Sequence, residues 1–231
     1  MALAVCDVAD EDILRACEIE FAAYKGSPLA PVLAPGPFPP DAAQERAKEL
    51  IEQRRNDSTI HYVQCRDETT GKLVAFSKYI VVQHPEDTAP PAPPASQPRV
   101  MPGRNVEASL MYSEGLAQRK KEIVGSRPHI CRFANRFFVC PHLPHTKLTL
   151  DLHLLHTDPA LQGRGAGGLL LDRIIKRADE LGLPIYLESS AAGHRFYQHR
   201  GLKDVELFKV DFRPYGGPVH EQPLMLREPL T

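Results

Sequence analysis

The chain has 231 residues and a formal net charge of −1, and this length is sufficient for one well-packed domain. The near-neutral charge gives no support to a nucleic-acid or membrane-surface partner. No apolar run approaches the ~20 residues of a membrane span, and the first residues become acidic too early for a secretory signal. The 5 scattered cysteines favour reduced thiols over a disulfide framework. We therefore expect a cytoplasmic protein, monomeric or homodimeric.

The first third of the chain is predicted to alternate strands with helices. Its elements are a strand over residues 3–8, a helix over 11–24, a helix from 41 to about 56, and strands over 59–66 and 72–83. Asp10 and Asp41 are expected to cap the helices, because an aspartate there accepts hydrogen bonds from the unpaired amides of the first turn. Residues 28–40 contain too many prolines for a regular element and are predicted to form a loop.

Residues from about 84 to 146 are predicted to be an insertion in the same domain. The insertion opens with an extended proline-rich connection, and Asn105 is expected to cap a helix that ends near Val124. Residues 129–140 are assigned to irregular structure with some helix or strand content. Histidines and cysteines between His129 and His145 have the spacings His-x-Cys and Cys-x-His-x-x-His, unlike usual zinc sites, so no metal is expected.

The remainder of the chain contains the clearest pattern. A strand over 147–156 leads into a glycine-rich turn, Gln162–Gly167, and then an amphipathic helix that ends at Leu181 before Gly182. The elements that follow are a strand over 185–188, a short helix over 191–200, and closing strands over 204–212 and 221–228. Strands interleaved with helices predict a mixed α/β fold, with residues 1–231 forming one domain.

A glycine turn between a strand and a helix is suited to hold an anion. Unpaired backbone amides and the positive end of the helix dipole point to the same place. The turn is neither a Walker A loop nor a dinucleotide fingerprint, because it lacks the Lys-Ser/Thr pair and the required glycine spacing. A nucleotide-binding domain, and a helix start with small residues for close packing, are the alternatives at this stage.

Two motifs occur at a characteristic separation: Pro159-x-x-Gln162-x-x-Gly165-x-Gly167, and Phe196-Tyr197-x-x-x-Gly201-Leu202. They resemble the motifs of the GNAT superfamily, the acyl-CoA-dependent N-acetyltransferases, and the resemblance covers residues 147–212. It implies the GNAT fold, a central mixed, mostly antiparallel, splayed sheet flanked by helices. Leu202 replaces the usual phenylalanine and Ser190 the usual asparagine. The Leu-Glu-Ser-Ser strand and the long middle segment resemble the branch that contains puromycin N-acetyltransferase.

The resemblance implies acetyl-CoA as co-substrate. The amides of the turn would hold the CoA diphosphate, and Arg164 would add a positive charge. The backbone at the end of the preceding strand would pair with the pantetheine amides, and Ser190 would contact the pantetheine arm. The implied cofactor-binding residues are Leu154, Leu155, His156, Thr157, Gln162, Gly163, Arg164, Gly165, Ala166, Gly167 and Ser190.

The resemblance also implies direct acetyl transfer without a covalent enzyme intermediate. Tyr197 is the candidate acid, since a hydroxyl near the sulfur can protonate the leaving thiolate. The incoming amine must lose a proton, and Asp151 lies where arylalkylamine members carry a base. His153, which strand alternation puts on the face of Asp151, and Glu188 are the next candidates. All three also fit a purely structural polar role.

The expected function is transfer of acetyl from acetyl-CoA to a primary amine of a small molecule. The near-neutral charge disfavours a histone tail, and the acceptor pocket is expected to come from the first helices and the insertion. A protein or peptide N-acetyltransferase and a non-catalytic CoA-binding module are the alternatives.

Overall fold

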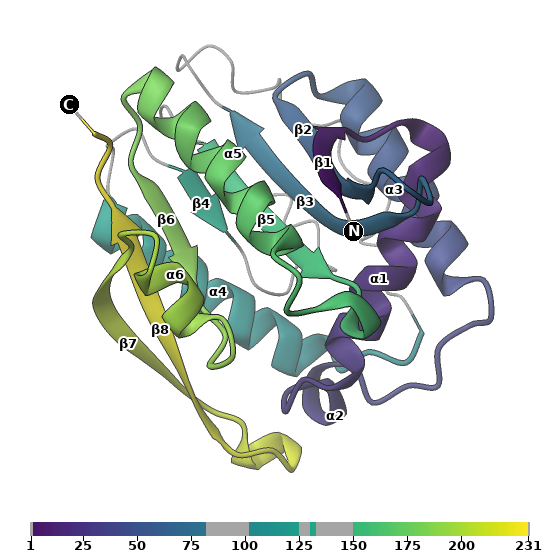
Figure 1. Ribbon diagram of the computed structural model, residues 1–231. Helices are drawn as coiled ribbons and strands as arrows, with labels where there is room; N and C mark the ends of the chain where they lie inside the picture. The colour runs from purple at the N-terminus through teal and green to yellow at the C-terminus, as the bar shows by residue number, and fades with distance from the viewer. Residues whose placement is uncertain (1, 82–101, 125–129, 133–149, 231) are drawn as a thin grey trace.

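The computed structural model describes residues 2–81, 102–124, 130–132 and 150–230. Its strands form two four-stranded sheets that lie next to each other (Figure 1). The first has the order β1 (Leu3–Asp7), β2 (Ile60–Asp67), β3 (Leu73–Val81), β5 (Leu150–Thr157), with every neighbouring pair antiparallel.

The second sheet has the order β4 (Ile130–Arg132), β6 (Ile185–Glu188), β8 (Val219–Arg227), β7 (Lys203–Asp211). The β4–β6 pair is parallel and the other pairs are antiparallel. The fold is therefore mixed and mostly antiparallel, as the sequence predicts. Strands β5 and β6 belong to different sheets, so the sheet is divided at the point where the sequence places the CoA site.

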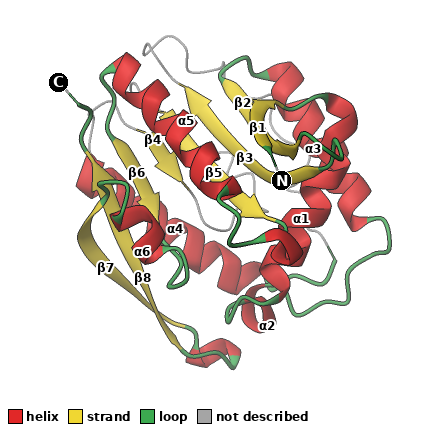
Figure 2. Cartoon of the chain, in the orientation of Figure 1, coloured by secondary structure: helices red, strands yellow, loops and turns green. Residues whose placement is uncertain are grey.

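Helices cover both sides of the sheets (Figure 2). They are α1 (Ile13–Lys25), α2 (Ala30–Leu33), α3 (Ala42–Asn56), α4 (Val106–Val124), α5 (Ala166–Leu181) and α6 (His194–Gln198), with short 3₁₀ turns at Asp10–Asp12, Pro159–Leu161 and Arg213–Tyr215. None of the described helices is long and apolar enough to cross a membrane.

Three apolar clusters determine which helix covers which face. Helices α1 and α3 pack on one face of the first sheet, where Ile13 and Leu50 meet Phe76. Helix α5 packs on the opposite face and reaches both sheets, because its buried residues contact β3 and β6 in a single cluster. Helices α2 and α4 cover the remaining face of the second sheet around Tyr186. The side opposite α5 is thus built from α1, α2, α3 and α4.

The predicted caps and loops are partly correct. Asn105 caps α4, because its Oδ1 accepts a hydrogen bond from the Ala108 amide at 3.1 Å. Asp10 does not cap α1; it lies in the 3₁₀ turn before that helix and its carboxylate pairs with Arg54 and Arg55. Asp41 precedes α3 without a capping hydrogen bond.

The proline-rich stretch is not entirely loop, because it contains α2. Pro31 lies in the first turn of α2, where the missing amide proton has no helical acceptor. The irregular stretch predicted over 129–140 includes β4, and the rest of it lies outside the described residues.

Candidate active site

The glycine turn has the predicted strand–turn–helix geometry. Gly163 (φ 75°) and Gly165 (φ 87°) adopt left-handed conformations, and Gly165 directly precedes α5. A Cβ on Gly167 would lie 3.2 Å from Thr157 Oγ1, so α5 starts close against the end of β5. The first-turn amides of α5 have no helical acceptor and surround the positive end of the helix dipole. This arrangement is chemically suited to a phosphate group.

Two contacts hold the turn in place. The Asp158 carboxylate accepts a hydrogen bond from the Ala160 amide at 3.0 Å, which fixes the 3₁₀ turn after β5. The same carboxylate forms an ion pair with Arg15 of α1, so the turn is connected to the helix on the other side of the sheet.

Arg200 is a second basic residue beside the turn, and the sequence gives no sign of its position. Its guanidinium lies 4.5 Å from the centre of the Phe196 ring, and its Nε donates to Asp172 Oδ1 at 2.7 Å. A Cβ on Gly168 would collide with it, so Arg200 rests against the first turn of α5. It adds positive charge next to the predicted diphosphate site, together with the exposed Arg164. This proximity results from the packing of α6 against α5, which no local motif encodes.

The end of β5 offers one backbone edge for an added strand. Leu154 and Thr157 pair with Lys78 and Ala75 of β3, and β5 is the edge strand of its sheet. No described strand pairs with the other edge, which faces the second sheet, and a pantetheine arm can extend the ladder there. The predicted backbone contacts of Leu154, Leu155, His156 and Thr157 are compatible with this edge.

A bulge in β5 alters the prediction made for the candidate bases. The register passes from Leu152 opposite Tyr79 to Leu154 opposite Lys78, so His153 is an extra residue in the ladder. Strict alternation, on which the shared face of Asp151 and His153 depends, therefore does not hold across this point. Asp151 is opposite Ile80, and the side chains of both candidates lie outside the described part of the chain.

Tyr197 is held firmly on α6. Its side chain is 2% exposed and belongs to the cluster formed by α5, β3 and β6. The Phe196 ring packs edge-on at 5.1 Å, and a Cβ on Gly193 would lie only 2.9 Å from the Tyr197 ring. Ser190 Oγ accepts a hydrogen bond from the Gly193 amide at 3.2 Å. The Ser190 hydroxyl therefore also stabilises the turn that positions α6.

Glu188 is the last residue of β6 and is fully buried. Side chains alternate along β6, so Glu188 shares the face of Tyr186, which packs toward α4. The next residue, Ser189, donates its amide to the Pro223 carbonyl at 2.8 Å and ends the pairing with β8. Glu188 and Tyr197 thus lie on either side of the turn that leads from β6 to α6.

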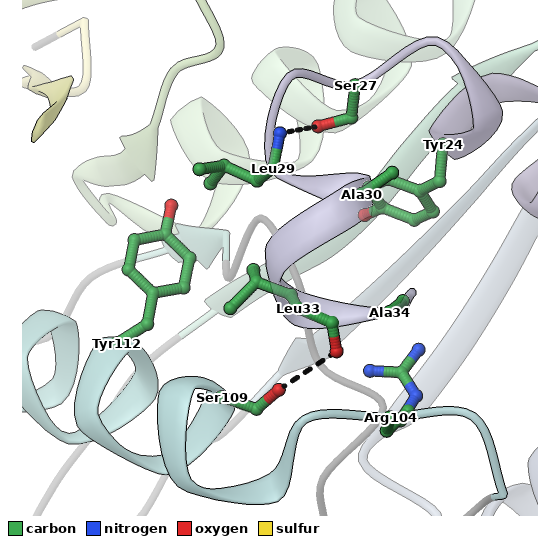
Figure 3. A pocket seen from close by; sticks show the side chains of 9 residues that line it. All are labelled: Tyr24, Ser27, Leu29, Ala30, Leu33, Ala34, Arg104, Ser109 and Tyr112. Carbon is green, nitrogen blue, oxygen red and sulfur yellow. Dashed lines mark hydrogen bonds between the residues drawn. The ribbon is translucent and has the colours of Figure 1, made fainter. Parts of the chain in front are cut away.

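A pocket opens on the side opposite α5 (Figure 3). It is lined by Tyr24, Ser27, Leu29, Ala30, Leu33, Ala34, Arg104, Ser109 and Tyr112. These residues come from the end of α1, from α2 and the residues next to it, and from α4 and the segment just before it, which are part of the predicted insertion.

The pocket is connected to both sheets at the division between them. The Tyr24 ring meets the His156 ring of β5 edge-on at 4.9 Å. The Tyr112 hydroxyl donates a hydrogen bond to Gln222 of β8, the strand that pairs with β6. The pocket therefore adjoins the end of β5 and the strand that pairs with β6.

Buried charges lie beside the pocket. Glu20 of α1 is 1% exposed, and neither of its carboxylate oxygens accepts a hydrogen bond from a described residue. Burial raises the pKa of Glu20, while Arg46 of α3, with its Nε 3.6 Å away, opposes that rise. Burial also lowers the pKa of Arg104 to about 10, with nearby Arg46 adding to the effect. Arg104 stays cationic at neutral pH.

Most of the histidines and cysteines weighed as a zinc site lie outside the described residues. Only the backbone of Cys131, in β4, is described. Within the ranges given above, no three His, Cys, Asp or Glu side chains come together in a way that suits a metal ion.

Residues 107–202 match the model of the acetyltransferase (GNAT) family, and this range contains the turn, α5 and Tyr197. Over this range the chain is similar to the GNAT acetyltransferases. An uncharacterized N-acetyltransferase of Schizosaccharomyces pombe, C56E4.07, is 37% identical over 87 residues, or 38% of this chain. The match spans only 37% of that relative's length.

Solved structures share the GNAT fold along nearly the whole chain. The C-terminal condensation domain of Ebony has a TM-score of 0.68 at 12% identity and covers 99% of both chains. The acetyltransferase yncA from Salmonella typhimurium, determined with acetyl-CoA, has a TM-score of 0.54 at 14% identity, covering 99% of this chain and 94% of its own. A histone acetyltransferase HPA2-related protein from Corynebacterium glutamicum has a TM-score of 0.57 at 18% identity, covering 100% and 98%. These TM-scores establish a common fold.

Proposed function

We propose that this protein transfers an acetyl group from acetyl-CoA to the primary amine of a small molecule. The proposal rests mainly on one juxtaposition. A Cβ on Gly167, in the first turn of α5, would lie 3.8 Å from the Phe196 ring, next to Tyr197. A phosphate-binding helix start and a candidate acid therefore lie on adjoining elements, as a CoA thioester requires.

The residues around the division between the sheets would bind acetyl-CoA in a defined direction. The amides of Gly163–Gly168 would hold the diphosphate, with Arg164 and Arg200 supplying charge. The free edge of β5 would pair with the pantetheine amides over Leu154–Thr157. The bound co-substrate supplies an activated acetyl thioester.

The chemistry needs two protons to leave the ammonium form of the amine and one to reach the sulfur. A base takes the first proton, which leaves the nitrogen lone pair available to form the new C–N bond at the thioester carbonyl, and the second proton leaves the nitrogen to solvent as the tetrahedral intermediate collapses. Tyr197 gives its hydroxyl proton to the sulfur as the C–S bond breaks, and recovers a proton from solvent. The products are an N-acetylated amine and free CoA, so no cysteine of the chain is required.

Three side chains are proposed for the base: Asp151, His153 and Glu188. Glu188 is the one whose side-chain burial the structure describes: it is fully buried, on the face of β6 that packs toward α4. Asp151 lies before the bulge of β5 and His153 lies at it, on the strand whose end adjoins the pocket through His156.

The pocket favours a small acceptor over a protein substrate, because two chain segments that are bonded to each other form its wall. The Asn105 amide donates to the Leu33 carbonyl at 3.1 Å, and the Gly36 amide donates to the Gly103 carbonyl at 2.8 Å. These bonds join the two chain segments that form the pocket wall.

The proposal is tested by incubating the protein with acetyl-CoA that carries a deuterated acetyl group and with a broad panel of primary amines and peptides. Mass spectrometry should detect labelled N-acetyl product in equal amount to the CoA released. Labelled product only on peptides would favour the protein-acetyltransferase alternative. CoA binding without transfer to any amine or peptide would favour the non-catalytic alternative.

A further inference from the structure

The acceptor pocket has a one-sided charge. Of the described residues that line it, Arg104 is the one with a formal charge, and none is acidic. The Ser27 and Ser109 hydroxyls are engaged with the backbone of α2, accepting from the Leu29 amide at 3.3 Å and donating to the Leu33 carbonyl at 3.4 Å. The rest of the wall is aromatic or aliphatic. Recognition of a charged group on a ligand in this pocket therefore depends on Arg104.

Arg104 is held in position by its neighbours along the chain. Gly103 accepts a hydrogen bond from the Gly36 amide, and Asn105 donates one to the Leu33 carbonyl. Gly103 has φ +86°, and a Cβ there would lie 2.5 Å from the Pro37 carbonyl oxygen, so the backbone fits closely at this point. Figure 3 shows the Arg104 side chain extending from the loop before α4 toward Ala34. Such fixed placement reduces the entropy lost when a ligand binds.

The described charged side chains near Arg104 include more cations than carboxylates. Arg46 Nη1 lies 2.7 Å from Glu49, and its Nε lies 3.6 Å from Glu20. Lys78 is also buried nearby, where its charge acts on Glu20. Among the described groups that act on Glu20, the cations Arg46, Arg104 and Lys78 outnumber the carboxylates Glu20 and Glu49, so an anion in the pocket would meet mostly positive charge.

We propose that the acceptor is a small amine that also carries a carboxylate or similar anionic group, and that Arg104 binds this group. The inference rests on the proposed function, because it names the substrate class of the same site. A guanidinium binds a carboxylate through two parallel hydrogen bonds. The apolar wall takes the carbon skeleton, and Tyr24, in contact with His156 of β5, marks the side on which the amine reaches the thioester. Arg104 would repel a dication such as a polyamine, and none of the described lining residues is acidic and able to pair with it.

The kinetic test compares amines with their carboxylated counterparts, such as tyramine with tyrosine and phenethylamine with phenylalanine. We expect kcat/KM to be at least about tenfold higher for the carboxylated members. Arg104→Met should lower kcat/KM for these members by about 10- to 100-fold, mainly through KM, and leave the others within about twofold. Arg104→Lys should retain part of the preference. Arg55→Met is the control, because the Arg55 side chain on α3 is 71% exposed. It should not change kcat/KM for either member of a pair.

Two kinetic results would overturn the inference. One is equal or better use of the amines that lack a carboxylate. The other is an equal loss of kcat/KM for the carboxylated and the uncarboxylated member of each pair in Arg104→Met, since that would indicate a structural role for Arg104.

A binding test separates this inference from the proposed function. 3-Phenylpropionate carries the carboxylate but no amine, so its affinity does not depend on acetyl transfer. Calorimetry in the presence of CoA should show binding to the wild type and at least about tenfold weaker binding to Arg104→Met. No binding, or equal affinity for both, would overturn the inference. Failure of every amine to accept acetyl would overturn the proposed function, and the calorimetry would still decide the role of Arg104.

Discussion

Tyr197 is the residue with the most specific expected effect. Tyr197→Phe removes one oxygen from a side chain that is 2% exposed and otherwise keeps its packing. Without a proton donor for the sulfur, we expect kcat to fall by about 100-fold or more, with the Kd for CoA within about twofold of the wild type. Steady-state rates and calorimetry measure the two quantities.

Tyr62→Phe is the matched control for this substitution. Tyr62 is also 2% exposed, and its hydroxyl donates to the Leu50 carbonyl at 2.9 Å; it lies on β2 of the first sheet, whereas α6 follows β6 of the second. We expect a stability loss of about 1 kcal/mol and an unchanged kcat. A kcat for Tyr197→Phe within about threefold of the wild type would remove Tyr197 from the mechanism.

Residues of the site differ in how far the sequence reveals them. Tyr197 and the glycines stand in local motifs, so their spacing alone identifies them. Arg104 and Arg200 have no such signal, because each reaches the site through the packing of segments that are distant in the sequence. The bulge at His153 is likewise invisible in the strand pattern, which continues through it without a glycine or proline.

At the scale of elements, α5 has glycines in left-handed conformations at both ends, Gly165 (φ 87°) and Gly182 (φ 64°). A Cβ at either position meets no atom within 4 Å, so alanine costs only backbone strain, roughly 1–2 kcal/mol. Gly165→Ala distorts the predicted diphosphate cradle and should weaken CoA binding at least about tenfold. Gly182→Ala should lose similar stability and keep its CoA affinity. Equal CoA affinities, measured by calorimetry, would place the cradle elsewhere.

The contact between α1 and α3 contains a buried ion pair, Glu20–Arg46, with side chains 1% and 4% exposed. Arg46→Met leaves the Glu20 carboxyl buried without this cation, and we expect a loss of about 3–5 kcal/mol in the free energy of unfolding. The double variant Glu20→Met/Arg46→Met should recover most of this lost free energy. Urea denaturation measures the free energy of unfolding of both variants, and a double variant no more stable than Arg46→Met would contradict this account of the contact.

The same pair gives an expected pH dependence. Burial raises the pKa of Glu20, and loss of Arg46 removes a charge that holds it down. The native state of Arg46→Met then keeps the proton at pH values where the unfolded chain has released it. Its stability should therefore fall as pH rises above the ordinary glutamate pKa of about 4.3. The double variant lacks the group and should not show this fall.

Elements with strong local signals were predictable from the sequence, and short ones were not. The amphipathic pattern of α5 and its Gly182 stop signal agree with the structure at both ends. Helix α2 has four residues within a proline-rich stretch, too few for periodicity to register, and tertiary packing of Val32 and Leu33 stabilises it. Asp10 has the sequence of a cap but pairs with arginines of α3, because a nearby cation competes with the helix amides.

For the whole molecule, CoA is expected to connect the two sheets. A ligand at 100 times its Kd stabilises the native state by about 2.7 kcal/mol, which for a chain of this size raises Tm by about 5–10 °C. ATP lacks the pantetheine arm that would pair with β5, and should give a much smaller shift. An equal shift with ATP would favour the nucleotide-binding alternative, and differential scanning fluorimetry distinguishes the two.

The most direct test of the account is a crystal structure of the protein with CoA. The diphosphate should accept hydrogen bonds from the amides of Gly163–Gly168, and the sulfur should lie within hydrogen-bond reach, about 3.5 Å, of the Tyr197 hydroxyl. The thiol end should point toward the pocket that contains Tyr24 and Arg104. A diphosphate bound away from the turn, or a Tyr197 hydroxyl more than about 6 Å from the sulfur with no bridging water, would contradict the account.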